Sequence, residues 1–172
     1  MRLILASQSA FRARLLAQAG VEVATEAAHI GEAEVKAAGR AEGMRVDEVA
    51  VLLAAMKAER VARRHPEALV IGADQILVCG DRWFDKPADL AEARSHLLAL
   101  RGRAHELVTA MVCQRGGQRL WQHVARPRLV MREFSEAFLD DYLAREGDIL
   151  TTTVGAYRVE GLGVQLFDRI EG

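Results

Sequence analysis

The sequence predicts an α/β fold built around a mixed β-sheet. Segments with helical spacing of apolar residues alternate with short apolar runs, and the turns between them suit both hairpins and crossover connections. The chain has 172 residues, 51% of them hydrophobic, which is enough to bury one core. No internal repeat or linker-like stretch divides it, so we expect a single domain over residues 1–172.

Helices are expected where apolar residues recur every three to four positions behind an N-cap residue or before a glycine. The segment 47–63 has the strongest pattern, with Asp47 as a candidate N-cap and apolar residues including Leu52 and Val61 on one face. Glu32 falls in a polar loop between expected elements. The expected helices are residues 9–19, 47–63, 89–100 and 135–145.

Strands are expected at short apolar runs bounded by turn signals. The segment 68–78 is almost wholly apolar, as in a central strand covered on both faces, and Gly80 with Asp81 offers a hairpin turn after it. The expected strands are residues 3–6, 68–78, 104–113, 119–132 and 157–170.

The charge balance narrows the function classes. With 23 basic and 24 acidic residues the formal net charge is −1, so no overall field draws the chain to nucleic acid or to an anionic membrane. No apolar run approaches the roughly 20 residues of a membrane-spanning helix, and the N-terminal run is shorter than the about 7 to 15 apolar residues of a secretory signal. We therefore expect a cytoplasmic protein without nucleic-acid or membrane partners.

Two charged residues stand at positions that the pattern assigns to the core. Asp74 lies inside the apolar strand, where a buried carboxylate needs a cation or hydrogen-bond donors to offset its desolvation. A hairpin turning at Gly80 would bring Lys86 beside it. Asp74 is then either a carboxylate satisfied by backbone amides or a catalytic group. Lys57 falls in line with the buried stripe of its helix, where it either extends to solvent or meets an anion.

The loop after the first strand offers hydrogen-bond donors for an anion. Ser7, Ser9 and Arg12 surround the start of the first helix, where free backbone N–H groups and the helix dipole favour negative charge. The same residues also fit ordinary N-capping by Ser9 with Arg12 in solvent.

Five short segments follow one another with compatible spacing across nearly the whole chain. They are Leu5–Arg12, Gly72–Gln75, Asp85–Pro87, Leu100–His105 and Gly155–Gly161. Taken together, these segments resemble the Maf family of nucleoside triphosphate pyrophosphatases. The resemblance implies an elongated, ITPase-like α/β fold with a twisted mixed sheet, flanking helices and a nucleotide cleft. It also implies hydrolysis of a nucleoside triphosphate to the monophosphate and pyrophosphate, with Mg²⁺ or Mn²⁺ as the cofactor.

The resemblance assigns roles to individual residues. Those that match the phosphate-binding groups of the family are Ser7, Arg12, Lys57 and Lys86. Asp74 matches the acid or base aspartate and Glu32 matches a carboxylate of the cleft, and together these two carboxylates would hold the metal.

Three further positions, Phe11, Gln75 and Glu160, bear on the choice of nucleotide. Members that resemble the pyrimidine-specific enzymes, which act on dTTP and UTP, have Arg, Thr and Gln there. The aromatic residue, Gln and Glu of this chain are similar to the branch that acts on 7-methyl-GTP. N7-methylation makes guanine cationic, and an aromatic face attracts such a ring, while a carboxylate accepts hydrogen bonds from guanine N1–H and the exocyclic amine. The alternatives are Phe11 as a core residue of the first helix and Glu160 as a solvated charge at the end of a strand.

Other functions stay open beside a 7-methyl-GTP pyrophosphatase. One is a dTTP and UTP pyrophosphatase, and another is a nucleotide-binding regulator of septum formation without turnover. The resemblance also implies a homodimer. Ala10 stands where the family usually has Pro, and the family's C-terminal strand and helix beyond Gly172 are expected to be absent.

Overall fold

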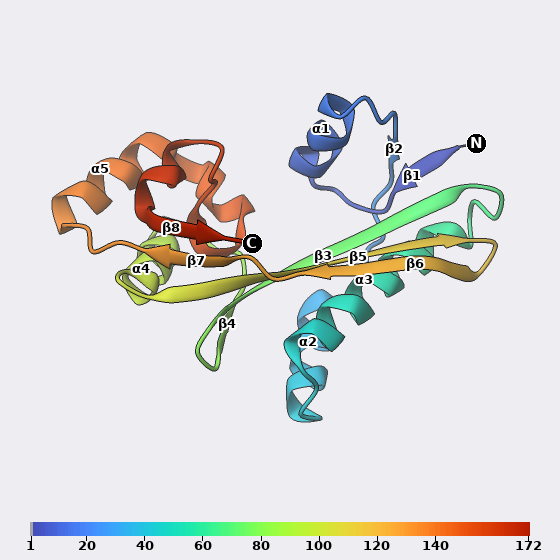
Figure 1. Ribbon diagram of the computed structural model, residues 1–172, viewed down its shortest axis with the longest axis horizontal. Coiled ribbons are helices and arrows are strands. Elements are labelled where there is room, and N and C mark those ends of the chain that lie inside the picture. The colour runs from blue at the N-terminus through green and yellow to red at the C-terminus, as the bar shows by residue number, and fades with distance from the viewer. Residues whose placement is uncertain (1) are drawn as a thin grey trace. The chain divides into compact units, whose positions relative to one another are not determined.

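The computed structural model describes residues 2–172 of the chain (Figure 1). These residues form two compact units, each built from two stretches of the chain. Unit 1 contains the residues up to Asp74 and the segment Thr109–Val124. Unit 2 contains Gln75–Val108 and Ala125–Gly172. No helix within residues 2–172 combines the length and the apolar character that crossing a bilayer requires.

Five α-helices and an eight-stranded sheet are present in the described chain (Figure 1). The helices are α1 (Ala10–Gln18), α2 (Glu32–Ala41), α3 (Val46–Ala62), α4 (Leu90–Leu100) and α5 (Glu136–Glu146). The strands are β1 (Leu3–Leu5), β2 (Ala24–Thr25), β3 (Leu69–Cys79), β4 (Arg82–Phe84), β5 (Ala104–Arg115), β6 (Gln118–Ala125), β7 (Arg128–Met131) and β8 (Phe167–Glu171). Three 3₁₀ helices follow α5: η1 (Gly147–Thr152), η2 (Val154–Ala156) and η3 (Leu162–Leu166).

The sheet mixes parallel and antiparallel pairs. Its strand order is β2-β1-β3-β5-β7-β8, with β4 beside β3 and β6 beside β5. Strand β1 runs parallel to β2 and β3, whereas the pairs β3–β4, β5–β7 and β7–β8 are antiparallel. The predicted α/β class with a mixed sheet and helices is therefore confirmed.

In unit 1, helix α3 packs directly on strand β3. A Cβ atom added at Gly72 of β3 would lie 2.0 Å from the carbonyl oxygen of Ala54 in α3, so the two backbones approach more closely than any side chain would allow. Val61 of α3 and Val70 of β3 are fully buried in one cluster around this contact. The glycine thus sets the distance between the helix and the strand that carry the two polar core residues.

Unit 2 has a hydrophobic core of its own. Side chains from its strands, from α4 and α5 and from the segment after α5 meet there. Its fully buried leucines include Leu77, Leu97, Leu100, Leu139, Leu150 and Leu166.

The structure confirms the four expected helices and corrects their details. Ser9 caps α1, because its hydroxyl accepts the N–H of Arg12. The N-cap of α3 is Arg45 rather than Asp47, and its own N–H donates to Glu48 at 2.8 Å. Leu52, expected on the buried face of α3, is exposed.

Helix α2 was not expected, and it changes the setting of Glu32. This residue is the first of α2 and does not lie in a loop. The sequence signals for the helix are weak, because its N-cap is Gly31, which has no side chain to form a capping bond, and Gly39 stands in its interior.

Two strand predictions fail for identifiable reasons. The expected strand 119–132 is broken into β6 and β7, with Pro127, which has no N–H to donate to a ladder, in the gap. Most of the expected strand 157–170 is irregular or 3₁₀-helical, and only β8 is extended. Leu162 and Leu166 are four residues apart, a helical spacing that the glycines at 161 and 163 obscure.

The hairpin after β3 has the expected turn but is shorter than expected. Gly80 adopts a φ of 60° between the strands, and the pairs run from Cys79 with Arg82 to Leu77 with Phe84. Because β4 ends at Phe84, the ladder does not reach Lys86, and the predicted pairing of Lys86 with Asp74 is wrong.

Candidate functional site

A buried ion pair joins helix α3 to strand β3 in unit 1. Lys57 is 7% exposed and Asp74 is 3% exposed. The ammonium of Lys57 donates to Oδ1 of Asp74 at 2.6 Å. Each residue was expected at a core position, and each supplies the opposite charge that the other needs to be buried. The partner of Asp74 is therefore Lys57.

The same ammonium also contacts Glu32 at the start of α2. The distance from Nζ of Lys57 to Oε1 of Glu32 is 2.8 Å, and the Glu32 side chain is about half exposed. One cation is thus held between two carboxylates, one buried and one at the surface.

One oxygen of the Asp74 carboxylate is available to accept a further hydrogen bond. This oxygen, Oδ2, is buried and has no hydrogen-bond partner within the described chain. Burial raises the pKa of Asp74, Glu32 raises it further, and Lys57 opposes the rise. A carboxylate of raised pKa with an unused buried oxygen is suited to take a proton from water or to ligate a cation.

Arg12 ties the first helix to the strand beside Asp74. Its Nη1 donates to the carbonyl of Ala73 at 2.9 Å and lies 3.5 Å from the hydroxyl of Ser7. Burial lowers the pKa of Arg12, while Asp74 and Glu32 act in the opposite direction. The guanidinium is therefore turned inward, toward the two carboxylates, and the alternative of Arg12 in solvent is wrong.

The loop before α1 is shaped by two serines. The hydroxyl of Ser7 accepts the backbone N–H of Ser9 at 3.1 Å, and Ser9 in turn accepts the N–H of Arg12 at 3.3 Å. N-capping by Ser9 thus coexists with a loop in which Ser7 and Arg12 contact each other. The structure brings five predicted residues of unit 1 into one network, namely Ser7, Arg12, Glu32, Lys57 and Asp74.

The network can supply two ligands to a divalent metal. Glu32 and Asp74 flank one ammonium, and Oδ2 of Asp74 is unpaired. No group of three or more His, Cys, Asp or Glu side chains suited to a metal occurs within residues 2–172. Two carboxylates fit Mg²⁺, which in proteins commonly keeps several waters and takes its remaining ligands from substrate phosphates.

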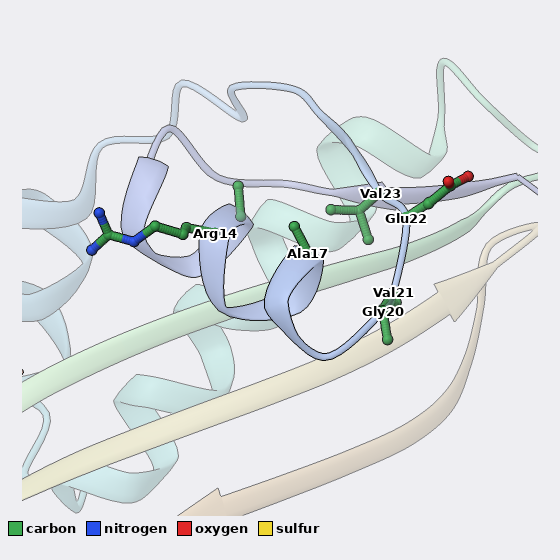
Figure 2. Close-up of a pocket in the computed structure, with 7 residues that line it drawn as sticks. Arg14, Ala17, Gly20, Val21, Glu22 and Val23 are labelled. Carbon is green, nitrogen blue, oxygen red and sulfur yellow. The ribbon is translucent and has the colours of Figure 1, made fainter.

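Phe11, a predicted base-contacting residue, lies on α1 and is 38% exposed. The guanidinium carbon of Arg14 stands 5.6 Å from its ring centroid. A hollow of about 650 Å³ lies beside α1. Figure 2 shows its lining, with Arg14 and Ala17 on the helix and Gly20–Val23 on the segment that follows. None of the predicted site residues lines this hollow, so it is not the site that the sequence predicted.

The remaining predicted residues belong to unit 2. Gln75 lies on β3 directly after Asp74, and Lys86 is exposed in the segment that follows β4. Glu160 is exposed in a turn in which the N–H of Gly161 donates to the carbonyl of Arg158 at 3.2 Å. Glu160 is solvated, as the alternative expected, but it is not at the end of a strand, because it lies between η2 and η3 and β8 begins only at Phe167.

Sequence reasoning did not find Lys36. Its charge lowers the pKa of Asp74, which places its ammonium within electrostatic range of that carboxylate. Lys36 stands four residues after Glu32 on α2, so the two side chains share a helix face. That spacing is visible in the sequence, but it has meaning only once α2 is known to be a helix.

Comparison with known proteins identifies one family and several relatives of this chain. The family described as Maf-like protein matches residues 2–172. A Granulibacter bethesdensis protein named nucleoside triphosphate pyrophosphatase is 56% identical over 172 residues, covering 100% of this chain and 87% of that protein. A Rhizobium etli protein named 7-methyl-GTP pyrophosphatase is 47% identical over 171 residues, covering 99% and 86%. A solved dITP/XTP pyrophosphatase from Mycobacterium abscessus has a TM-score of 0.46 and 14% identity, covering 88% of this chain and 97% of that one.

Proposed function

Because the chain belongs to the Maf family, we propose that it is a nucleoside triphosphate pyrophosphatase that releases pyrophosphate from its substrate. The observation that carries the proposal is the buried Lys57–Asp74 pair with Glu32 and Arg12 around it. This cluster combines cations for phosphates with a carboxylate that can accept a proton.

The charges of the cluster suit a triphosphate. A nucleoside triphosphate brings about four negative charges, which positioned cations and backbone donors stabilise as the bond breaks. Lys57 and Arg12 supply two cations, and Ser7 supplies a hydroxyl beside Arg12. Since Glu32 and Asp74 balance these two charges, the metal would supply the net positive charge for the phosphates. Lys86, which matches the family's second phosphate-binding lysine, would add a third cation.

Asp74 is assigned the role of base. A water molecule loses a proton to Oδ2 of Asp74 as the oxygen of the water forms a bond to the α-phosphorus of the nucleotide. The bond between the bridging oxygen and the α-phosphorus breaks, and pyrophosphate leaves with the electron pair. Burial favours this role, since it raises the pKa of Asp74 and makes the carboxylate a stronger base.

Glu32 and Asp74 would hold the divalent metal, Mg²⁺ or Mn²⁺. When bound, the metal would offset phosphate charge and polarise the phosphoryl oxygens. The unpaired Oδ2 of Asp74 supports this assignment. Lys57 keeps Oδ1 of the same carboxylate fixed, and the two lone pairs of Oδ2 would serve the metal and the proton of the attacking water.

The proposed substrate is 7-methyl-GTP. Phe11 offers an exposed aromatic ring for the cationic base, and Glu160 offers a carboxylate for guanine N1–H and the exocyclic amine. Gln75 would add an amide beside Asp74. A relative of 47% identity that is named 7-methyl-GTP pyrophosphatase supports this choice.

Pyrophosphate release by the purified chain tests the proposal. The assay compares 7-methyl-GTP, GTP, UTP and dTTP with Mg²⁺ or Mn²⁺, using Asp74→Asn as the inactive variant and Asp141→Asn, at an exposed aspartate of α5, as the matched control. We expect preferential release from 7-methyl-GTP, lost in Asp74→Asn and kept in Asp141→Asn. Preferential release of pyrophosphate from dTTP and UTP would contradict 7-methyl-GTP as the substrate. Nucleotide binding without pyrophosphate release would contradict the enzymatic function and favour a nucleotide-binding regulator.

A further inference from the structure

A partly buried ion pair in unit 2 lies next to the turn that carries Glu160. Nη2 of Arg158 donates to Oε2 of Glu146, the last residue of α5, at 3.0 Å. The side chains of Arg158 and Glu146 are 25% and 6% exposed. Most other ion pairs of this unit are more exposed, and such pairs contribute little to stability. Because the Glu146 side chain is buried, its carboxylate would be costly without the Arg158 cation, and this requirement fixes the position of Arg158.

Arg158 is also the first residue of the Glu160 turn. The N–H of Gly161 donates to the carbonyl of Arg158 at 3.2 Å, so Arg158 to Gly161 form a four-residue turn with Glu160 at its third position. Fixing Arg158 therefore fixes the base of the turn from which the Glu160 carboxylate projects.

Close packing after the turn and hydrogen bonds before it also fix the position of the neighbouring backbone. A Cβ atom added at Gly163 would lie 2.4 Å from the carbonyl oxygen of Arg158, so the chain after the turn packs directly on the residue that begins it. Before the turn, the hydroxyl of Tyr142 donates to the carbonyl of Ala156, and His105 and Tyr157 are hydrogen-bonded at 2.8 Å. Only the tip, Val159 and Glu160, is exposed.

We propose that Glu146 and Arg158 are positioning residues for recognition of the nucleotide base. Their ion pair anchors the 158–161 turn to α5 and so holds the Glu160 carboxylate in the geometry that the guanine edge requires. This inference rests on the proposed function for the role of Glu160. Neither residue touches the substrate, and both act through the turn.

Positioning of this kind predicts an effect on substrate binding. Without the pair, Glu160 samples more orientations, and a bidentate contact with guanine is lost more readily than the chemistry at the phosphates. Glu146→Ala should raise the KM for the preferred guanine nucleotide about tenfold while kcat changes less than about twofold. Glu146→Gln, which keeps an acceptor for Arg158, should have a smaller effect.

A double-mutant cycle separates positioning from general stability. In a Glu160→Ala background, Glu146→Ala should change kcat/KM by less than about twofold, because the carboxylate it positions is gone. An equal loss in both backgrounds would overturn the proposal and leave the pair with a structural role only. Asp141→Ala, which removes an exposed partner of Arg145 on the same helix, is the matched control.

Hydrogen exchange provides a readout that does not depend on turnover. Glu146→Ala should speed amide exchange in residues 158–163 and leave the rest of unit 2 as in the wild type and in Asp141→Ala. Unchanged exchange in that segment would overturn the anchoring itself. If the wild type hydrolyses no triphosphate, the proposed function fails, whereas this exchange comparison still decides whether the pair holds the turn.

Discussion

Lys57 donates a hydrogen bond to Asp74 across 2.6 Å, from a helix to a strand, with both side chains buried. Both side chains are almost wholly removed from water, so each charge is tolerated because the other is present. The pair therefore links the stability of unit 1 to the chemistry proposed for it.

The first prediction concerns stability. Lys57→Met leaves the carboxylate of Asp74 buried without its cation and should lower the free energy of unfolding by about 3 kcal/mol. Adding Asp74→Asn should recover most of that loss, since the double variant buries no charge at this place. Urea denaturation of the four proteins measures the cycle. Independent, additive losses would show that the two side chains do not depend on each other.

The second prediction concerns the metal. Chelation should abolish pyrophosphate release, and Mg²⁺ or Mn²⁺ should restore it. Glu32→Gln should raise the metal concentration needed for half-maximal activity about tenfold. Glu34→Gln, two residues further along α2 and exposed, should leave it unchanged. Full activity after exhaustive chelation would contradict the assignment of Glu32 and Asp74 as ligands.

The sequence indicated which residues of the cluster were unusual but not how they meet. Asp74 and Lys57 could be recognised because each interrupts an apolar pattern at a core position, which periodicity shows directly. Their pairing could not, because periodicity defines the buried face of an element and not the element that packs on it. The expected hairpin made Lys86 the predicted partner of Asp74, but the observed pairing of β3 with β4 ends at Phe84.

The missed elements share a physical cause. Helix α2 has no side-chain cap, and its interior glycine weakens the helical signal, so Glu32 was assigned to a loop. The turn around Glu160 is held by tertiary contacts of Arg158 with Glu146 and Gly163, which local propensity does not contain. The resemblance to the Maf family nevertheless singled out Glu32 and Glu160 as candidate residues without the fold around them.

The third prediction concerns acid stability. Burial lowers the pKa of His105 from its ordinary value of 6.5 to about 4. The unfolded chain therefore binds a proton below pH 6.5 that the folded chain does not bind until about pH 4, so stability falls as the pH falls through this window. The loss from this one residue is on the order of 3 kcal/mol.

His105→Gln should flatten that slope. Glutamine keeps a polar partner for Tyr157 but does not titrate. Urea denaturation at intervals between pH 7 and pH 4 gives the slope, with His123→Gln on the exposed strand β6 as the matched control. Parallel slopes for wild type and His105→Gln would show that folding does not lower the pKa of His105.

The fourth prediction concerns the contact that sets the distance between α3 and β3. A methyl group at Gly72 would lie 2.0 Å from the carbonyl oxygen of Ala54 and 2.8 Å from the amide nitrogen of Ala58, and neither backbone atom can move without shifting the helix. Gly72→Ala should therefore lower the free energy of unfolding by about 3 kcal/mol, and it should reduce kcat as well, because Lys57 shifts with α3 away from Asp74. At Gly31 an added methyl group meets the flexible side chain of Glu34 and φ is negative, so Gly31→Ala should lower the free energy of unfolding by no more than about 1 kcal/mol, the difference between Gly and Ala as the N-cap of α2. Equal stability of Gly72→Ala and Gly31→Ala in thermal or urea denaturation would show that the helix is free to move off the strand, and the close packing would then not be what positions the ion pair.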